Sequence, residues 1–200
     1  MDVRARGGIR VRAPGARWQG GRMTVRTAPT HSLGAERLTA VRALLDSAFD
    51  GDFSAADWDH TLGGVHAWIE DGTGLVAHGA VVQRRVLHRG RSYRTGYVEG
   101  VAVRADARRR GLGGAVMDAL ERVIDATHAF GALSASDEGA ALYRGRGWQV
   151  WGGRIAVLGP EGIVRLPEEE GGVFVRAAGA LALPDQGAPL VFDWRDGDVV

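Results

Sequence analysis

The chain has 200 residues, of which 45% are hydrophobic and 24% are charged, and its formal net charge at pH 7 is +1. Cysteine is absent and all 25 basic residues are arginine, which excludes disulfides, thiolate nucleophiles, cysteine-bound zinc and Schiff-base lysines. The length fits one globular domain with a hydrophobic core, and no apolar run reaches the roughly 18 residues of a membrane span, so we expect no membrane partner and a cytoplasmic location.

The first 22 residues differ in composition from the rest. They hold six arginines and one acid and show no apolar period, so we expect a disordered arginine-rich tail in 1–22 and a single domain in 23–200. A start at Met23 and a nucleic-acid-binding arm are the alternatives for this tail. The domain itself carries 19 basic and 23 acidic residues, a net charge of −4. Its bunched acids favour a cationic ligand over nucleic acid.

The periodicity of apolar residues, together with turn residues and with Ser54 as a helix cap, predicts seven strands and four helices. The strands are expected over 24–27, 65–70, 75–88, 92–104, 132–134, 148–158 and 172–176. The helices are expected over 33–49, 55–62, 113–128 and 137–146. This interleaved order predicts an α/β (α+β) fold with a mixed central sheet of about seven strands flanked by about four helices.

Glu99 stands among apolar neighbours in the strand over 92–104. Strict alternation would place it on one face of that strand with Tyr97, Val101 and Val103. A buried carboxylate is costly unless it is paired or functional, which makes Glu99 a candidate base in a cleft. Gly100 beside it predicts a bulge or a close approach of the backbone to a ligand. An edge-strand glutamate that reaches solvent is the alternative.

A glycine-rich turn, Arg108-Arg109-Arg110-Gly111-Leu112-Gly113-Gly114, joins this strand to the next helix. Backbone N–H groups and the positive end of a helix converge at such a turn, which suits a diphosphate with arginines as charge partners. The spacing fits neither the P-loop nor the dinucleotide fingerprint, and an ordinary connection remains possible for the turn alone. Following this particular strand, it predicts a nucleotide-like cofactor.

Several further motifs occur in a fixed order along 23–200. They include Gly51-Asp52-Phe53-Ser54, Gly96-Tyr97-Val98-Glu99, Leu142-Tyr143 with Gly147-Trp148, and Asp193-Trp194-Arg195-Asp196. With the glycine turn they resemble the GNAT superfamily of acyl-CoA-dependent N-acetyltransferases and, within it, the aminoglycoside 2′-N-acetyltransferases. Two features depart from that family: the chain ends in Val199-Val200 where the family usually has tryptophan, and 177–190 follows it poorly. Both concern the wall of the acceptor site.

The resemblance implies a GNAT fold and an acetyl-CoA-dependent transfer of acetyl to the 2′-amine of aminoglycosides, which gives antibiotic resistance by drug modification. It implies that Glu99 acts as a base through water, that the main-chain N–H of Val101 holds the oxyanion, and that Tyr143 protonates the CoA sulfur. Without the motif, Tyr143 would read equally well as a core tyrosine. The residues expected to hold acetyl-CoA are Val101, Val103, Arg108, Arg109, Gly111, Gly113 and Gly114.

The acceptor would be a polycation, so acids from separate stretches are expected around it. The candidates are Asp52, Asp57, Glu99, Glu169, Asp196 and Asp198, together with the chain end at Val200. Each acid could instead be a solvated surface residue. His60 and His66 are six residues apart without a cysteine nearby, so we expect no metal.

Other functions remain open at this stage. A GNAT enzyme that acetylates another small amine, such as a cell-wall amino sugar or a polyamine, would carry the same motifs. A CoA-binding regulatory protein without catalysis is a second possibility, although Glu99 and Tyr143 are both present. The family resemblance also implies a homodimer.

Overall fold

The computed structural model describes residues 24–197 and 200, so the tail predicted over 1–22 and the candidate Asp198 lie outside the described residues. The described chain contains four α-helices: α1 (Gly34–Ala48), α2 (Ala55–Thr61), α3 (Leu112–Thr127) and α4 (Asp137–Arg144). Each lies within a few residues of its predicted range. Among the described residues, no helix combines the length and apolar content needed to cross a membrane.

Ten strands of the described chain form one mixed sheet. They are β1 (Arg26–Pro29), β2 (Val65–Asp71), β3 (Gly74–His88), β4 (Arg91–Val103), β5 (Phe130–Ser134), β6 (Gln149–Val150), β7 (Ile155–Gly159), β8 (Gly162–Arg165), β9 (Val173–Ala177) and β10 (Leu190–Asp193). Their order is β6-β9-β5-β4-β3-β10-β7-β8, with β2 on β3 and β1 on β2. The α/β class and the four flanking helices are therefore confirmed, and the sheet has more strands than the seven expected.

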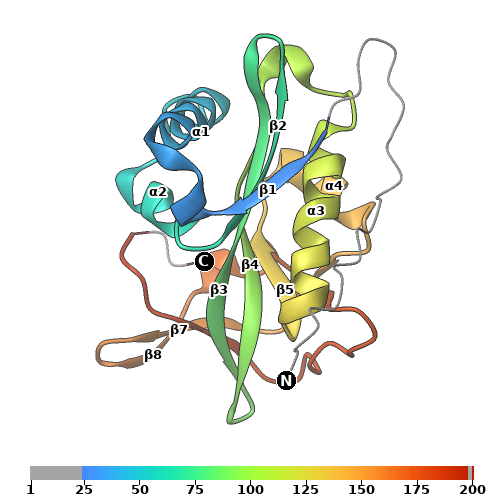
Figure 1. Cartoon of the computed structure of the whole chain (residues 1–200). Coiled ribbons are helices and arrows are strands. Elements are labelled where there is room, and N and C mark those ends of the chain that lie inside the picture. Colours follow the sequence, from blue (N-terminus) through green and yellow to red (C-terminus); the bar gives the residue numbers. More distant parts are fainter. Residues whose placement is uncertain (1–23, 198–199) are drawn as a thin grey trace, which may run out of the picture.

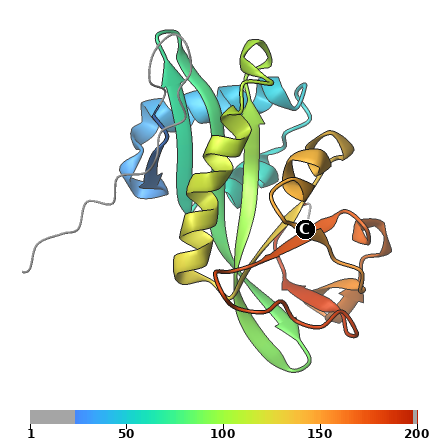
Figure 2. The ribbon, with the colours of Figure 1, turned by 90° about the vertical axis from the view of Figure 1, so that its right-hand side faces the viewer.

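The extra strands have simple causes. The segment predicted as one strand over 148–158 divides into β6 and β7, with Gly152 and Gly153 in the intervening loop. Two further strands, β8 and β10, are only four residues long and show no clear alternation. Figure 2 shows these C-terminal strands, orange to red, beside the lower half of the long β3–β4 hairpin.

The helices cover both faces of the sheet (Figure 1). Helices α1 and α2 contact β3 and β4 on one face, and α3 crosses β2, β3, β4 and β5 on the other. One face of α3 is buried against the sheet, with Val116, Leu120 and Ile124 all at 0% exposure and Val123 partly buried beside them. Burial of this apolar face removes it from water and so stabilises α3, while the polar face opposite remains in solvent.

Strands β4 and β5 pair over only a short length. Their parallel ladder joins Thr95–Tyr97 to Phe130–Ala132 and then ends. From there to Val103 no ladder with β5 is recorded among the described residues. The central sheet is therefore open on this side of β4, immediately before the glycine turn.

Candidate active site

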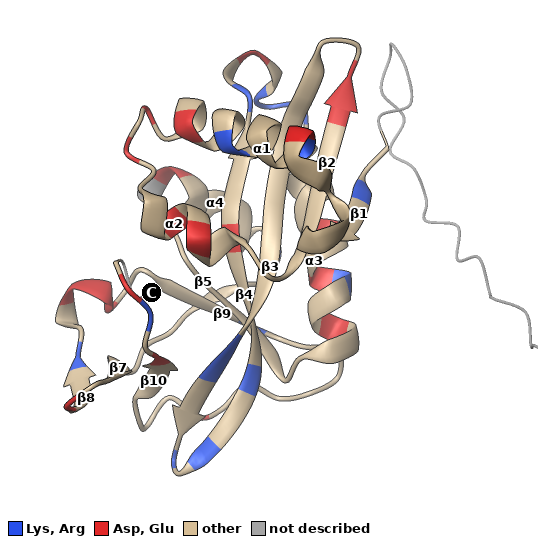
Figure 3. Cartoon of the chain, turned by 60° about the vertical axis from the view of Figure 1, so that its left-hand side comes forward, with Lys and Arg blue, Asp and Glu red and all other residues tan. Residues whose placement is uncertain are grey.

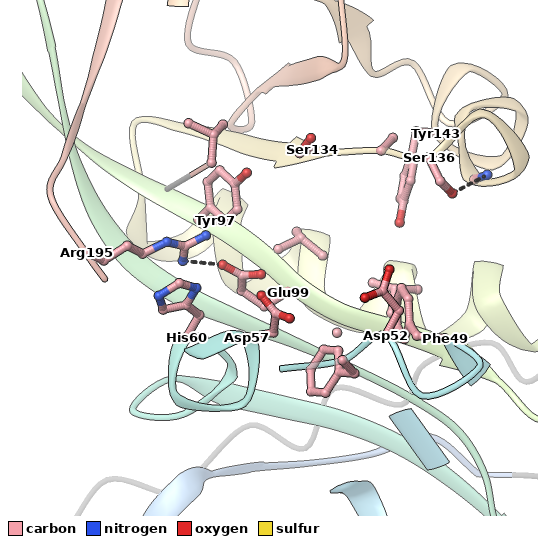
Figure 4. A pocket seen from close by; sticks show the side chains of 17 residues that line it. Phe49, Asp52, Asp57, His60, Tyr97, Glu99, Ser134, Ser136, Tyr143 and Arg195 are labelled. Carbon is pink, nitrogen blue, oxygen red and sulfur yellow. Dashed lines mark hydrogen bonds and ion pairs between the residues drawn. The ribbon is translucent and has the colours of Figure 1, made fainter. Parts of the chain in front are cut away.

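A cavity of about 480 Å³ opens where β4 and β5 separate (Figure 4). Its walls come from the α1–α2 loop, α2, β4, the β5–α4 loop with α4, and the C-terminal segment. The polar and terminal residues that line it are Asp52, Asp57, His60, Tyr97, Glu99, Ser134, Ser136, Tyr143, Arg195 and Val200. The structure thus brings together acids and a tyrosine from parts of the sequence that are far apart.

Glu99 projects from β4 into this cavity beside Arg195 (Figure 4). The carboxylate is 15% exposed, and its Oε1 accepts a hydrogen bond from Arg195 Nη1. Burial raises the pKa of Glu99 above its usual value, and the Arg195 guanidinium opposes this rise. A carboxylate with a raised pKa is a stronger base than a solvated one. Glu99 therefore lies in a cleft and not on a solvent-exposed edge.

Tyr97 holds the arginine of this pair in place. The guanidinium of Arg195 lies 5.2 Å from the centre of the Tyr97 ring, and that of Arg84 lies 5.0 Å from it. Arg84 is itself fixed by Asp193, whose Oδ1 accepts a hydrogen bond from Arg84 Nε at 2.8 Å. Stacking on an aromatic face and an ion pair with a carboxylate both restrict a guanidinium. The C-terminal segment is thereby fastened to the strands that form the cavity.

The acceptor side of the cavity is acidic. Asp52 and Asp57 line it, and Figure 4 shows the Asp57 carboxylate beside Glu99 and the Asp52 carboxylate on the side of Tyr143. Asp57 also caps α2, since its Oδ2 accepts the N–H of Ser54 at 2.7 Å. Figure 3 shows acidic residues on α2 and basic residues at the far end of β3 and β4. This charge separation favours a cation at the cavity.

The main chain beside Glu99 forms the predicted bulge. The β3–β4 register passes from Ala80↔Glu99 to His78↔Ala102, so Gly100 and Val101 both lie opposite Gly79. Gly100 adopts φ +53°, in the left-handed region. The extra residue reverses the alternation, and the expectation that Val101 and Val103 share a face with Glu99 is wrong: both pack on the α3 side of the sheet.

Tyr143 reaches the cavity from α4 (Figure 4). Its side chain is 7% exposed and its ring packs 6.2 Å from Trp148 and 6.1 Å from Phe174. Burial raises the pKa of Tyr143 to about 12, so the phenol keeps its proton at neutral pH. A protonated phenol that faces the cavity can serve as a general acid. A purely structural tyrosine would not need to face the cavity.

The glycine turn directs the start of α3 toward the open edge of β4. Arg109 and Gly111 have φ values of +59° and +75°, and Gly111 is the N-cap of α3. No side chain caps this helix among the described residues, and its first turn contains no acid. The turn arginines are exposed, with Arg108 Nε 3.3 Å from the Val103 carbonyl. The N–H groups of the first turn and the helix dipole thus form an anion-binding end.

Comparisons with known proteins identify the family. Residues 29–151 match the acetyltransferase (GNAT) domain family. The aminoglycoside 2′-N-acetyltransferase of Mycolicibacterium fortuitum is 49% identical over 178 residues, which cover 88% of this chain and 91% of that protein. The chain belongs to the aminoglycoside 2′-N-acetyltransferase family.

Solved structures agree on the fold. The Escherichia coli GNAT family N-acetyltransferase YhbS, solved in complex with CoA, superposes with a TM-score of 0.63 at 17% identity and covers 88% of this chain and 91% of its own. An acyl-CoA N-acyltransferase from Pseudomonas aeruginosa superposes with a TM-score of 0.54 at 16% identity, covering 78% of this chain and 99% of its own. The GNAT fold expected from the sequence is confirmed.

GNAT acetyltransferases use acetyl-CoA, and the turn before α3 suits the diphosphate of that cosubstrate. A Cβ at Gly113 would lie 3.5 Å from Leu142, and one at Gly114 would lie 3.5 Å from Arg146. These are ordinary contact distances, so packing within the protein does not demand glycine at either position. The missing side chains instead leave the backbone N–H groups open to a ligand.

Some residues expected at the acceptor site lie outside the cavity. Glu169 and Asp196 are not among the described residues that line it. Glu169 lies just behind the wall, where Ser134 Oγ donates to its Oε2 at 3.5 Å. Asp196 is exposed, and its main chain interacts with the His60 ring. Val200 does line the cavity and is 5% exposed.

Two residues of the cavity wall were not predicted as functional from the sequence. Arg195 is the clearest, since a site for a polycation gives no reason to expect a cation beside its base. The only available signal was its position within the Asp193–Asp196 motif. His60 also lines the cavity, and burial together with Arg195 lowers its pKa. Among the described residues, no group of three or more histidine, aspartate or glutamate side chains could hold a metal ion.

Proposed function

We propose that this protein is an acetyl-CoA-dependent N-acetyltransferase that acetylates the 2′-amine of aminoglycosides and so inactivates them. One observation carries the proposal: the buried carboxylate of Glu99 lies in an acidic cavity beside the open edge of β4. The same edge of β4 ends at the anion-binding turn before α3. The 49% identity to an aminoglycoside 2′-N-acetyltransferase over most of both chains supports the same acceptor.

Glu99 acts as the base. Aminoglycoside amines are mostly protonated near neutral pH, so one proton must leave before nitrogen can attack a thioester. The raised pKa of Glu99 suits it to accept this proton, through a water molecule as the family resemblance implies. The carboxylates of Asp52 and Asp57 hold the other ammonium groups of the acceptor and orient the amine.

Two further groups complete the transfer. The N–H of Val101, in the bulge next to Glu99, donates a hydrogen bond to the oxyanion that forms when the amine attacks the acetyl carbonyl. Tyr143 then gives its proton to the sulfur that leaves, and the raised pKa of its phenol supports the protonated state that this step needs. The amide bond forms, the carbon–sulfur bond breaks and CoA leaves as a thiol. The second proton of the attacking nitrogen then returns to the Tyr143 phenolate, and the proton taken by Glu99 passes to solvent.

The cosubstrate is held along the strand and at the turn. Val101 and Val103 offer main-chain groups on the side of β4 that no longer pairs with β5. Arg108, Arg109 and the N–H groups of Gly111–Gly114 bind the diphosphate. We propose that the outer wall of the acceptor site is formed by Glu169, Asp196, Asp198 and Val200. The position of Val200 in the cavity lining supports its part in this wall.

A thiol-release assay tests this function directly. Tobramycin carries a 2′-amine and kanamycin a 2′-hydroxyl, so we expect acetyl-CoA-dependent thiol release with tobramycin and little with kanamycin. Equal turnover of both would overturn the 2′ assignment. Turnover of a polyamine or an amino sugar without turnover of tobramycin would establish the alternative acceptor, and acetyl-CoA binding without any thiol release would indicate a regulatory protein.

We also propose that the enzyme works in the cytoplasm as a homodimer. Its cosubstrate is a cytoplasmic metabolite, and the family resemblance supports the dimer. Sedimentation equilibrium of the purified chain should give twice the 21.3 kDa mass of one chain. We propose that residues 23–200 form the single catalytic domain, so deletion of residues 1–22 should leave turnover unchanged.

A further inference from the structure

Two buried histidines connect the α2–β2 loop to the bulge in β4. His66 on β2 and His78 on β3 are both 0% exposed. His66 Nδ1 lies 2.9 Å from His78 Nε2, and His78 Nδ1 lies 2.9 Å from the carbonyl oxygen of Gly100. At the other end, Thr30 Oγ1 lies 2.8 Å from His66 Nε2 and accepts the N–H of Gly63 at 2.9 Å.

The direction of every hydrogen bond in this chain is determined. A carbonyl oxygen only accepts, so His78 must carry a proton on Nδ1. Burial lowers the pKa of His66 to about 4 and that of His78 to about 3, so each ring is neutral near pH 7 and has one N–H. His78 Nε2 therefore accepts from His66 Nδ1–H. His66 Nε2 accepts from the Thr30 hydroxyl, for which it is a closer acceptor at 2.8 Å than the Gly64 carbonyl oxygen at 3.3 Å. All donors point toward Gly100.

The end of the chain lies on a particular peptide group. The carbonyl of Gly100 and the N–H of Val101 belong to one planar trans peptide, so they point in opposite directions. A hydrogen bond from His78 to this carbonyl fixes the plane of the peptide and directs the Val101 N–H away from His78. Aligned hydrogen bonds polarise one another, which makes that N–H a stronger donor.

We propose that His78, supported by His66 and Thr30, is a positioning residue for acetyl transfer, because it orients and polarises the Gly100–Val101 peptide whose N–H holds the oxyanion. The proposal rests on the function proposed above. Neither histidine lines the cavity, so neither touches substrate. They act through the peptide alone.

The bulge explains why such support is needed. Gly100 departs from the regular ladder at φ +53°, and Gly100 and Val101 share one opposing residue, Gly79. A bulged peptide has fewer regular neighbours to hold its plane than a peptide within a ladder. Oxyanion stabilisation depends on a donor fixed before the charge develops. The histidine chain supplies that fixation from the side of the sheet opposite α3.

A matched pair of substitutions isolates the hydrogen bond. His78→Asn keeps a side-chain N–H at the position of Nδ1, whereas His78→Leu has nearly the same shape as asparagine and no donor. We expect His78→Leu to lower kcat by about 10- to 100-fold, since losing an entire oxyanion donor costs about 100- to 1,000-fold. The KM and Kd for acetyl-CoA should change by less than about threefold, and His78→Asn should recover most of kcat.

His88→Leu serves as the control for loss of a buried histidine. His88 lies on the same strand, β3, is 3% exposed and its Nδ1 lies 3.1 Å from the Pro189 carbonyl, outside the cavity lining. It should lose stability with little change in kcat. Wild-type kcat in a folded His78→Leu variant, or equal losses in the leucine and asparagine variants, would overturn the proposal.

Nuclear magnetic resonance gives a second test that does not depend on the leucine variant folding. The ring ¹⁵N shifts of the wild-type protein should show the proton on Nδ1 of both histidines, and the amide ¹⁵N of Val101 should shift in His66→Gln, which interrupts the chain. A proton on Nε2 of His78 would overturn the proposal. These signals need no acceptor, so absence of thiol release with aminoglycosides would refute the proposed function while leaving this result readable.

Discussion

The two ends of the proposed active site are built in opposite ways. The acetyl-CoA end comes from one continuous segment, Val101–Gly114, and uses mainly backbone N–H groups, a helix terminus and exposed arginines. The acceptor end is assembled from five separate parts of the chain and uses side chains that range from the largely buried Glu99 to the exposed Asp52. A continuous backbone site suits a cosubstrate common to a superfamily, whereas an assembled side-chain site can change its acceptor through its loops. The two ends should therefore respond independently to substitution.

The strongest test of this independence is Glu99→Gln at the acceptor end. The amide keeps the shape but cannot accept the proton, so kcat/KM should fall by about 100- to 10,000-fold at neutral pH. Acetyl-CoA affinity, measured by calorimetry, should stay nearly unchanged. Activity should return in part at high pH, where more of the acceptor amine is already neutral. Loss of acetyl-CoA binding would show that the two ends are not separate.

The reciprocal test is Gly114→Asp at the cosubstrate end. A carboxylate in the first turn of α3 interacts favourably with the helix dipole, so the free energy of unfolding should rise by about 0.3 to 1 kcal/mol. The same charge repels a diphosphate, so acetyl-CoA should bind about tenfold more weakly. Gly114→Asn, without the charge, is the matched control. Unchanged acetyl-CoA affinity in the aspartate variant would place the diphosphate elsewhere.

Tyr143 lies between the two ends, and Tyr143→Phe should reduce turnover less than Glu99→Gln does. Its ring keeps the contacts with Trp148 and Phe174, so folding should be unaffected. Turnover should slow by about tenfold or more, because the leaving sulfur loses its proton donor, while acetyl-CoA affinity remains. A fully active Glu99→Gln/Tyr143→Phe double variant would remove both residues from the mechanism.

Arg195→Gln should change the pH profile more than the maximal rate. Burial raises the pKa of Glu99 and Arg195 lowers it, so loss of the guanidinium lets this pKa rise further. A base is active only when ionised, above its pKa. The acidic limb of kcat/KM should therefore move to higher pH. A limb that stays in place or moves to lower pH would contradict the pairing.

Much of the molecule was predictable because its signals are local. All four helices were found: α1 and α3 carry an apolar period, and Ser54 marks the start of the short helix α2, which it caps in the structure. Glu99 and Gly100 are adjacent in sequence and the glycine turn follows at Arg108–Gly114, and their unusual residue types mark them directly. The short strands β8 and β10 were missed because four residues are too few for a period to show.

The rest depends on contacts between distant segments. Arg195 meets Glu99 from 96 residues away, and no local pattern indicates that pairing. The prediction that Val101 shares a face of β4 with Glu99 was wrong, because one bulge reverses the alternation of every later residue in the strand. His66 and His78 gave no sign of their common path to Gly100, since their geometry exists only once β2, β3 and β4 are in register.

The Arg195–Glu99 pair has a chemical consequence for an enzyme that handles a reactive thioester. A cation beside the base compensates its buried charge, but a lysine there would present an amine in the very place where amines become acylated. A guanidinium stays charged and is a poor nucleophile. Arginine therefore neutralises the charge of the base without itself becoming acylated, and the chain contains no lysine side chain that the thioester could acylate.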